Sequence, residues 1–307
     1  MIIKTSVYSE NPAYAIIKTF SVSSLRSAFL GCVSSIFFNF FFRQYRAVLL
    51  KGKVPVSNVD HPLDEKIPFV PSWITIYLDF VAYWVRLVSF LLRNWRHRSY
   101  DIVNEFVSSI GKLYAFAAQA YRKNFSTTKR PFYIARPRFF LIHLVDPHLM
   151  CIPSLHIMVV IHTYTMFSHI ARMLGEEDSL SRHLVEMKQG AMAISQAILY
   201  VKQHSVNCVA AGMYAMTCFD PVRFSAAEAE NFISLLFGKA PAADENLKIP
   251  RGSRVHPSAS PSTKLPVDVQ AEIKSYILAL YRRFLSEKKE DGHWSEPLLN
   301  FMFPLRK

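Results

Sequence analysis

The longest stretch without a formally charged residue covers residues 147–171, between Asp146 and Arg172. About 20 apolar residues suffice to cross a bilayer as a helix, so this run predicts a tilted membrane span. Pro153, Ser154 and His156 near its start are unusual for a simple anchor. With Pro153 in the first turn, the free backbone N–H groups and the helix dipole would favour a bound anion. A serine cap on a helix whose imidazole faces interfacial water is the simpler alternative.

Other apolar runs extend this prediction to the whole first part of the chain. They cover residues 27–42, 67–92, 102–121 and 189–219, and the last is long enough for two helices that turn near Lys202 and His204. The sequence therefore predicts an all-α polytopic membrane bundle of about six spans, with residues 27–219 as the membrane domain. Residues 172–188 are expected to form a charged loop. Residues 102–121, which carry Glu105 and Lys112, fit a soluble amphipathic helix as an alternative.

The charge balance indicates a membrane partner. Lys and Arg number 36 against 23 Asp and Glu, a net charge of +13, and the basic residues form short clusters between apolar runs. Such clusters are typical of loops that face anionic lipids, whereas a nucleic-acid-binding protein gathers its charge on one stripe or helix. We therefore expect an integral protein of the inner or plasma membrane and no nucleic-acid partner.

Both ends of the chain are predicted to be cytoplasmic. Residues 1–26 lack the pattern of a cleavable signal peptide. Residues 220–307 form a polar C-terminal extension, in which residues 225–237 predict a short amphipathic helix and residues 238–266 a linker. Residues 267–287 carry an apolar stripe at helical spacing, which would lie on the membrane or pack against neighbouring helices.

Three groups of polar residues fall at the outer ends of the predicted spans. They are Lys123 with Arg130-Pro131, Pro153-Ser154-Leu155-His156, and His204. Lys and Arg neutralise phosphate oxygens, and a serine hydroxyl with backbone N–H groups adds oriented donors. One imidazole can attack phosphorus while the other protonates the leaving oxygen. Together these residues predict a phosphate site that faces outward.

The order of these groups resembles the three signatures of the type 2 phosphatidic acid phosphatase superfamily over residues 68–219. The Pro-Ser-Leu-His form is similar to the branch that contains inositol phosphotransferases and inositol phosphorylceramide synthases. The resemblance implies a six-span protein that hydrolyses or transfers lipid phosphate groups without a metal or other cofactor. His204 would be the nucleophile that forms a phosphohistidine, His156 the general acid, and Lys123, Arg130 and Ser154 the phosphate-binding residues.

The sequence departs from the family pattern at the third signature, Ser-Arg-x5-His-x3-Asp. The Ser and Arg positions hold Ala197 and Ile198, and the Asp position holds Cys208. In the family this carboxylate would fix the tautomer of the nucleophilic imidazole, which a thiol does poorly. Asp146 is the nearest acidic alternative in the sequence, although an aspartate before proline is usually a turn residue.

The first signature has two overlapping frames, because Lys129 and Arg136-Pro137 have the same spacing as Lys123 and Arg130-Pro131. We prefer the earlier frame, since Lys123 follows the apolar run directly. The histidines lack the spacing of a metal site, and the four cysteines lack that of a zinc site or disulfide framework.

Two rival functions remain at this point. One is a catalytically impaired scaffold or lipid-binding protein of the same fold, and the other is a channel or transporter. A transport pathway would need the charges within the spans to line one continuous cavity; these charges are Asp79, Arg86, Glu105 and Lys112. The enzyme instead requires the imidazoles of His156 and His204 to lie within about 10 Å of each other.

Overall fold

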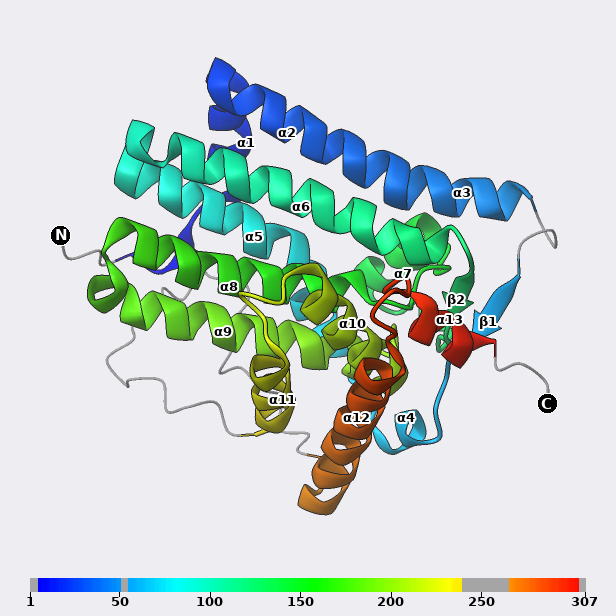
Figure 1. Ribbon diagram of the computed structural model, residues 1–307. Helices are drawn as coiled ribbons and strands as arrows, with labels where there is room; N and C mark the ends of the chain where they lie inside the picture. Colours follow the sequence, from blue (N-terminus) through cyan, green and yellow to red (C-terminus); the bar gives the residue numbers. More distant parts are fainter. Residues whose placement is uncertain (1–4, 51–54, 239–264, 304–307) are drawn as a thin grey trace.

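The computed structural model describes residues 5–50, 55–238 and 265–303 and is predominantly helical, as predicted (Figure 1). Its helices are α1 (Pro12–Ser21), α2 (Ser23–Ile36), α3 (Phe42–Leu49), α4 (Leu63–Lys66), α5 (Ile74–Trp95), α6 (Tyr100–Tyr121), α7 (Pro137–Val145), α8 (Leu155–Leu174), α9 (Glu177–Tyr200), α10 (Val206–Phe219), α11 (Ala226–Leu235), α12 (Val267–Glu287) and α13 (Glu296–Met302). Two short parallel strands, β1 (Val56–Asn58) and β2 (Phe125–Thr127), pair near one end of the bundle.

Within the described residues, three helical stretches are long and apolar enough to cross a membrane. They are Ser23–Leu49, Pro71–Tyr121 and Leu155–Leu174. The second contains α5 and α6, which the backbone separates at Arg96, where φ is 50°. These stretches are compatible with a membrane protein, but the predicted six spans are not confirmed.

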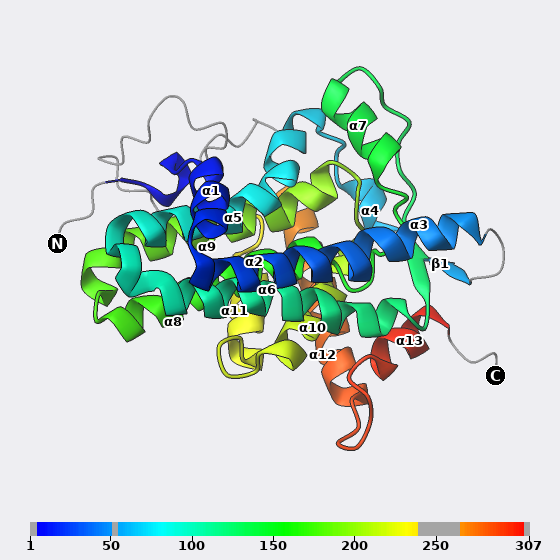
Figure 2. The ribbon, with the colours of Figure 1, turned by 90° about the horizontal axis from the view of Figure 1, so that it is seen from above.

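The stretch Ser23–Leu49 is the most exposed of the three. Figure 2 shows α2 and α3 as one long rod beside α6, joined by a π-helical segment at Phe37–Phe41. Of the 18 most apolar consecutive residues in this stretch, only 11% are buried, against 67% and 72% in the other two stretches. Its outward face carries large apolar side chains, among them Phe38 and Leu49. A continuous apolar face of this kind is suited to contact with lipid or another apolar surface.

The predicted loop at residues 172–188 is wrong, because the chain turns at Gly175 and then enters α9. Sequence patterning missed this half of α9 because it is rich in charged residues, and a distant part of the chain satisfies one of them, Glu186. The buried Glu186 carboxylate accepts hydrogen bonds from the backbone N–H groups of Val7 and Tyr8, at 3.2 and 3.3 Å. The predicted turn near Lys202 and His204 is present between α9 and α10. Helix α10 has 14 residues, fewer than a membrane span needs.

Helix α8 begins later than the charge-free run suggested. Ser154 is the N-cap and Leu155 the first helical residue, so Pro153 precedes the helix and does not occupy its first turn. Residues 147–154 instead form an irregular segment beside β2, where Met150 forms a bridge with Ser126 and the backbone N–H group of Ile152 donates to Ser126 Oγ at 2.8 Å. Residues 147–154 therefore lie outside helix α8 and are held beside β2.

The C-terminal helices pack against the helical bundle. Helices α11 and α12 match the predicted segments closely, and residues 239–264 of the predicted linker lie outside the described residues. The apolar stripe of α12, including Ile273, Ile277 and Phe284, is buried, and α12 packs on α10. Tyr276 donates a hydrogen bond to Asn207 Oδ1 at 2.7 Å. Asn207 lies three residues after His204, so this contact places α12 beside the turn that holds His204.

A close contact between α8 and α10 leads to a prediction about Gly212. A Cβ atom at this position would lie 2.7 Å from Cβ of Ile157, next to His156 in α8. We expect Gly212→Ala to lower stability by about 1–3 kcal/mol, because the helices must separate to accept the methyl group. At Gly31 in α2 a Cβ would meet nothing within 4 Å. Gly31→Ala should therefore preserve or raise stability through its better helix propensity. Thermal unfolding followed by circular dichroism in detergent compares the two variants; equal melting temperatures would contradict the prediction.

Candidate functional site

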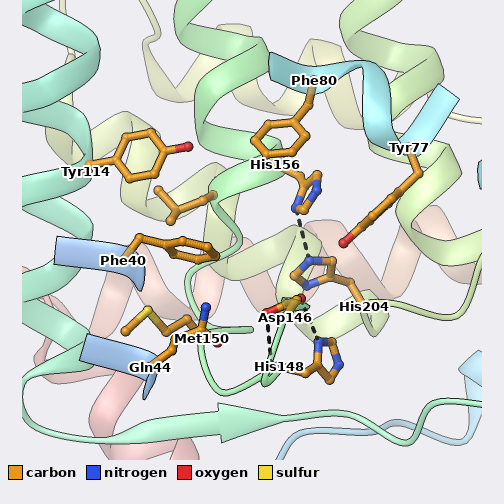
Figure 3. A pocket seen from close by; sticks show the side chains of 11 residues that line it. Phe40, Gln44, Tyr77, Phe80, Tyr114, Asp146, His148, Met150, His156 and His204 are labelled. Atoms are coloured by element: carbon orange, nitrogen blue, oxygen red, sulfur yellow. Dashed lines mark hydrogen bonds and ion pairs between the residues drawn. The ribbon is translucent and has the colours of Figure 1, made fainter. Parts of the chain in front are cut away.

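Two histidines that lie 48 positions apart in the sequence meet at one end of the bundle. Nε2 of His204 and Nδ1 of His156 are 3.3 Å apart, and the ring centroids are 5.2 Å apart (Figure 3). His156 lies in the first turn of α8, where its ring contacts Tyr77 and Phe80 of α5, with centroids 4.4 and 4.1 Å away. The two imidazoles thus satisfy the distance that the sequence analysis required.

The turn between α9 and α10 fixes the position of His204. The carbonyl of Ile198 accepts hydrogen bonds from the backbone N–H groups of both Gln203 and His204, at 3.0 and 3.2 Å. Lys202 adopts a left-handed conformation with φ of 54°, which reverses the chain at the end of α9. Ser205 then caps α10 by accepting from the backbone N–H group of Asn207. Short-range backbone bonding therefore holds the His204 side chain toward α8.

The histidine cavity between the helices is small and mostly aromatic. Its lining includes Phe40 and Gln44 from the exposed rod, Tyr77 and Phe80 from α5, and Tyr114 from α6 (Figure 3). Its volume is about 30 Å³, which is room for one water molecule. The second nitrogens of both catalytic candidates, Nε2 of His156 and Nδ1 of His204, are buried without a hydrogen-bond partner in the described part of the chain.

Asp146 lines this cavity and pairs with Arg130, which lies just outside the lining. Arg130 donates to Asp146 Oδ2 at 2.6 Å and to the Asp146 carbonyl at 3.1 Å. Asp146 also accepts a hydrogen bond from the backbone N–H group of His148 at 3.0 Å. His148 lines the cavity, and its Nε2 lies 2.7 Å from Thr128 Oγ1. Asp146 therefore reaches the cavity, but its hydrogen bonds go to Arg130 and His148 and not to His204.

The structure brings together residues from both frames of the first signature. Arg130 of the preferred frame and Lys129 of the alternative frame line one pocket beside the histidine cavity. Lys123 is exposed and lines neither the histidine cavity nor this second pocket. The pKa of His293 is lowered mainly by burial and to a smaller extent by the positive charge of Lys123. Arg136 is exposed at the N-cap of α7. The prediction that Lys123 lies at the phosphate site therefore does not fit this structure.

Ser154 lies where the sequence predicted, at the start of α8, but its hydroxyl has a different environment from a capping serine. The residue is fully buried, makes no side-chain capping bond, and its Oγ has no hydrogen-bond partner among the described residues. An unsatisfied buried hydroxyl is unfavourable, so it marks a group that would gain from an incoming acceptor. The side chain lines neither the histidine cavity nor the pocket beside it, so the structure does not place this hydroxyl at the predicted phosphate site.

The positions that depart from the family pattern lie beside the histidines. Cys208 is a buried free thiol, and so is Cys151, whose sulfur lies 3.4 Å from His148 Nε2. Ile198 is buried and places no charge at the site. Asn207 donates to the carbonyl of Val59 at 3.1 Å and accepts from Tyr276, so it does not take over the role of the missing carboxylate.

Comparisons with models of known protein families, with curated proteins and with solved structures found no match. The resemblance to the phosphatase superfamily therefore depends on the motif residues alone.

The charges within the candidate spans either pair with other side chains or are exposed. Asp79 and Arg86 pair with each other through two hydrogen bonds of 2.7 Å, Glu105 lies 3.6 Å from Arg223, and Lys112 is exposed. None of these side chains lines the pockets described above. Over residues 5–50, 55–238 and 265–303, no group of three or more His, Cys, Asp or Glu side chains could hold a metal ion. The histidine pair therefore remains the chemically most distinctive feature of these residues.

Proposed function

We propose that this protein is a membrane-bound lipid phosphate phosphatase or phosphotransferase that acts through a phosphohistidine at His204. The observation that supports this most directly is the 3.3 Å approach of Nε2 of His204 to Nδ1 of His156. Two imidazoles in hydrogen-bond contact favour opposite protonation roles, because one must donate while the other accepts. A nucleophile and a proton donor need that division of roles.

The reaction would take place in two displacements. In the first, His204 Nε2 attacks phosphorus, a P–N bond forms, the P–O bond to the leaving alcohol breaks, and His156 protonates the released oxygen. In the second, His156 removes a proton from water or an acceptor alcohol, whose oxygen attacks phosphorus and releases His204. Arg130 would stabilise the charge on the nonbridging oxygens.

Substrate entry requires the site to open. A phosphoryl group between the two rings needs about 3 Å on each side, so the nitrogens must move from 3.3 Å to roughly 6 Å apart. Arg130 must also exchange Asp146 for phosphate. The aromatic side chains that line the histidine cavity come from separate helices, so a small shift of α5 or the rod would widen it.

Phosphate release from short-chain phosphatidic acid tests the proposal. The purified protein in detergent with EDTA is expected to release phosphate, and Arg130→Gln to release it about 10²-fold more slowly because a charged contact to the phosphate is lost. Lys123→Gln is the matched control, since Lys123 is exposed and lines neither pocket. Equal rates for the wild type and Arg130→Gln would contradict the proposed role of Arg130.

A scaffold or lipid-binding function is the second candidate, and the observation in its favour is the environment of Cys208. A buried free thiol stands at the position where the family carboxylate would support the nucleophile. Turnover separates the candidates. An absence of phosphate release from several donors in a folded sample, together with retained lipid binding, would favour the scaffold.

A further inference from the structure

We propose that the pocket beside the histidines binds a headgroup that carries both a phosphate and an ammonium group, which makes a zwitterionic phosphodiester lipid the preferred ligand. This inference rests on the proposed function for the adjoining histidines, but the pocket can be tested without turnover. The polar pocket is defined by its six charged lining residues, Asp60, Asp64, Glu65, Lys129, Arg130 and Lys202.

The polar pocket has the size and position for a headgroup. Its volume is about 540 Å³, within the usual range of roughly 300–1,000 Å³ for small-molecule sites. Arg130 lines it, and the carboxylate that Arg130 binds, Asp146, lines the histidine cavity. The Arg130–Asp146 pair thus forms the boundary between the two spaces. A phosphate that replaced Asp146 at Arg130 would lie at this boundary, next to His156 and His204.

The rest of the polar pocket has an excess of carboxylates. Arg130 is already paired with Asp146, which leaves Lys129 and Lys202 against Asp60, Asp64 and Glu65. The chain therefore offers an anionic region within reach of a cationic one. A ligand with an ammonium group on one side and a phosphate on the other matches this arrangement, whereas a purely anionic headgroup has no cation to place beside the carboxylates.

Local bonding keeps two of these carboxylates in place. Both oxygens of Asp60 accept from the backbone N–H group of Lys129, at 3.0 and 3.1 Å. Asp64 accepts from the backbone N–H groups of His61 and Val206, at 2.7 and 2.9 Å. Neutral N–H donors orient a carboxylate without cancelling its charge. These acids are therefore held in place at the polar pocket, where Lys202 lies beside Asp64 and the excess carboxylate remains for a cation of the ligand.

The partial burial of Asp64 and Lys202 is expected to strengthen the binding of a charged ligand. Burial raises the pKa of Asp64, with hydrogen bonds from Ser205, Val206 and His61 acting in the opposite direction. Burial also lowers the pKa of Lys202, whose ammonium group donates to the Asp64 carbonyl. Both charged forms lack full hydration, so an opposite charge from a ligand stabilises them more than it would at a fully exposed site.

Calorimetric titration of the full-length protein in detergent tests the inference, with phosphoethanolamine and glycerol 3-phosphate as probes. We expect phosphoethanolamine to bind more tightly. Glu65→Gln should weaken its binding about two- to fivefold, the range for one exposed charge pair, and leave glycerol 3-phosphate unchanged. Glu65→Lys should reverse the preference. Glu65 is exposed, so these variants are not expected to disturb folding. Glu290→Gln, also exposed but outside the pocket lining, is the matched control.

The binding results test the headgroup assignment separately from the proposed catalytic function. Equal or tighter binding of glycerol 3-phosphate by the wild type, or an unchanged preference in Glu65→Lys, would overturn the ammonium assignment even if phosphatidic acid is hydrolysed. The expected selectivity without any phosphate release would instead retain the pocket and reject catalysis.

Discussion

Replacing His204 with alanine is expected to abolish phosphate release, by about 10⁴-fold or more, because the covalent step loses its nucleophile. The loss should be the same for substrates with good and poor leaving groups, since no substrate can supply the missing nitrogen. Incubation with a radiolabelled phosphate donor and an acid-labile phosphoprotein assay should detect label on the wild type and none on His204→Ala.

His156→Ala provides the contrast that identifies the role of each ring. Loss of a general acid lowers the rate by about 10²–10⁴-fold when the leaving group is an alkoxide. The rate should recover largely with p-nitrophenyl phosphate, whose leaving group needs little protonation. His97→Ala is the matched control, because His97 is exposed in the turn between α5 and α6. Rescue of His204→Ala by the activated substrate, or labelling of that variant, would reject the assignment.

Asp79→Ala is expected to cause the largest loss of stability, about 3–5 kcal/mol, because it removes the carboxylate that pairs with Arg86 and leaves the buried charge over the Tyr8 ring without its hydrogen-bonded partner. The pair joins two successive turns of one face of α5 through two hydrogen bonds of 2.7 Å, and the side chains of Asp79 and Arg86 are only 6% and 12% exposed. Urea unfolding in a mild detergent, followed by tryptophan fluorescence, should show a clearly lower midpoint.

A double variant shows which of two effects causes the loss of stability: the burial of an unpaired charge, or the loss of the attraction between Asp79 and Arg86. Asp79→Leu combined with Arg86→Met removes both charges and should regain most of the stability lost in Asp79→Ala. The exposed pair Lys66–Glu272, with both side chains 48% exposed, is the control, and Glu272→Ala should change stability by less than about 1 kcal/mol. A loss in Glu272→Ala as large as in Asp79→Ala would contradict the role assigned to burial.

Most of the helices could be predicted from the sequence because their signals are local. The apolar runs correspond to the exposed rod and to α5, α6 and α8, and the stripe in residues 267–287 corresponds to α12. The first half of α9 could not be predicted this way. Its carboxylate Glu186 is buried against Val7 and Tyr8, and a contact across about 180 positions leaves no periodic trace in the surrounding residues.

The chemistry of the candidate site could be predicted from the sequence, but only some of the residues that form it could. Motif order selected His156 and His204, which the structure brings together, and it selected Lys123, which the structure leaves exposed near His293. The two lysine frames have identical spacing, so spacing could not distinguish Lys123 from Lys129. The fold distinguishes them, because the backbone N–H group of Lys129 is bound by Asp60 at the edge of the polar pocket.

The sequence by itself determined that this protein is largely helical, with apolar stretches suited to a membrane, and that two histidines follow helix boundaries. These properties depend on residue type and short-range spacing, which the linear order contains. Only the tertiary structure decided that Arg130 binds Asp146, that the histidine cavity is small, and that α12 packs beside the site. Each of these depends on the distance between side chains from different elements, which the packing of the whole bundle sets.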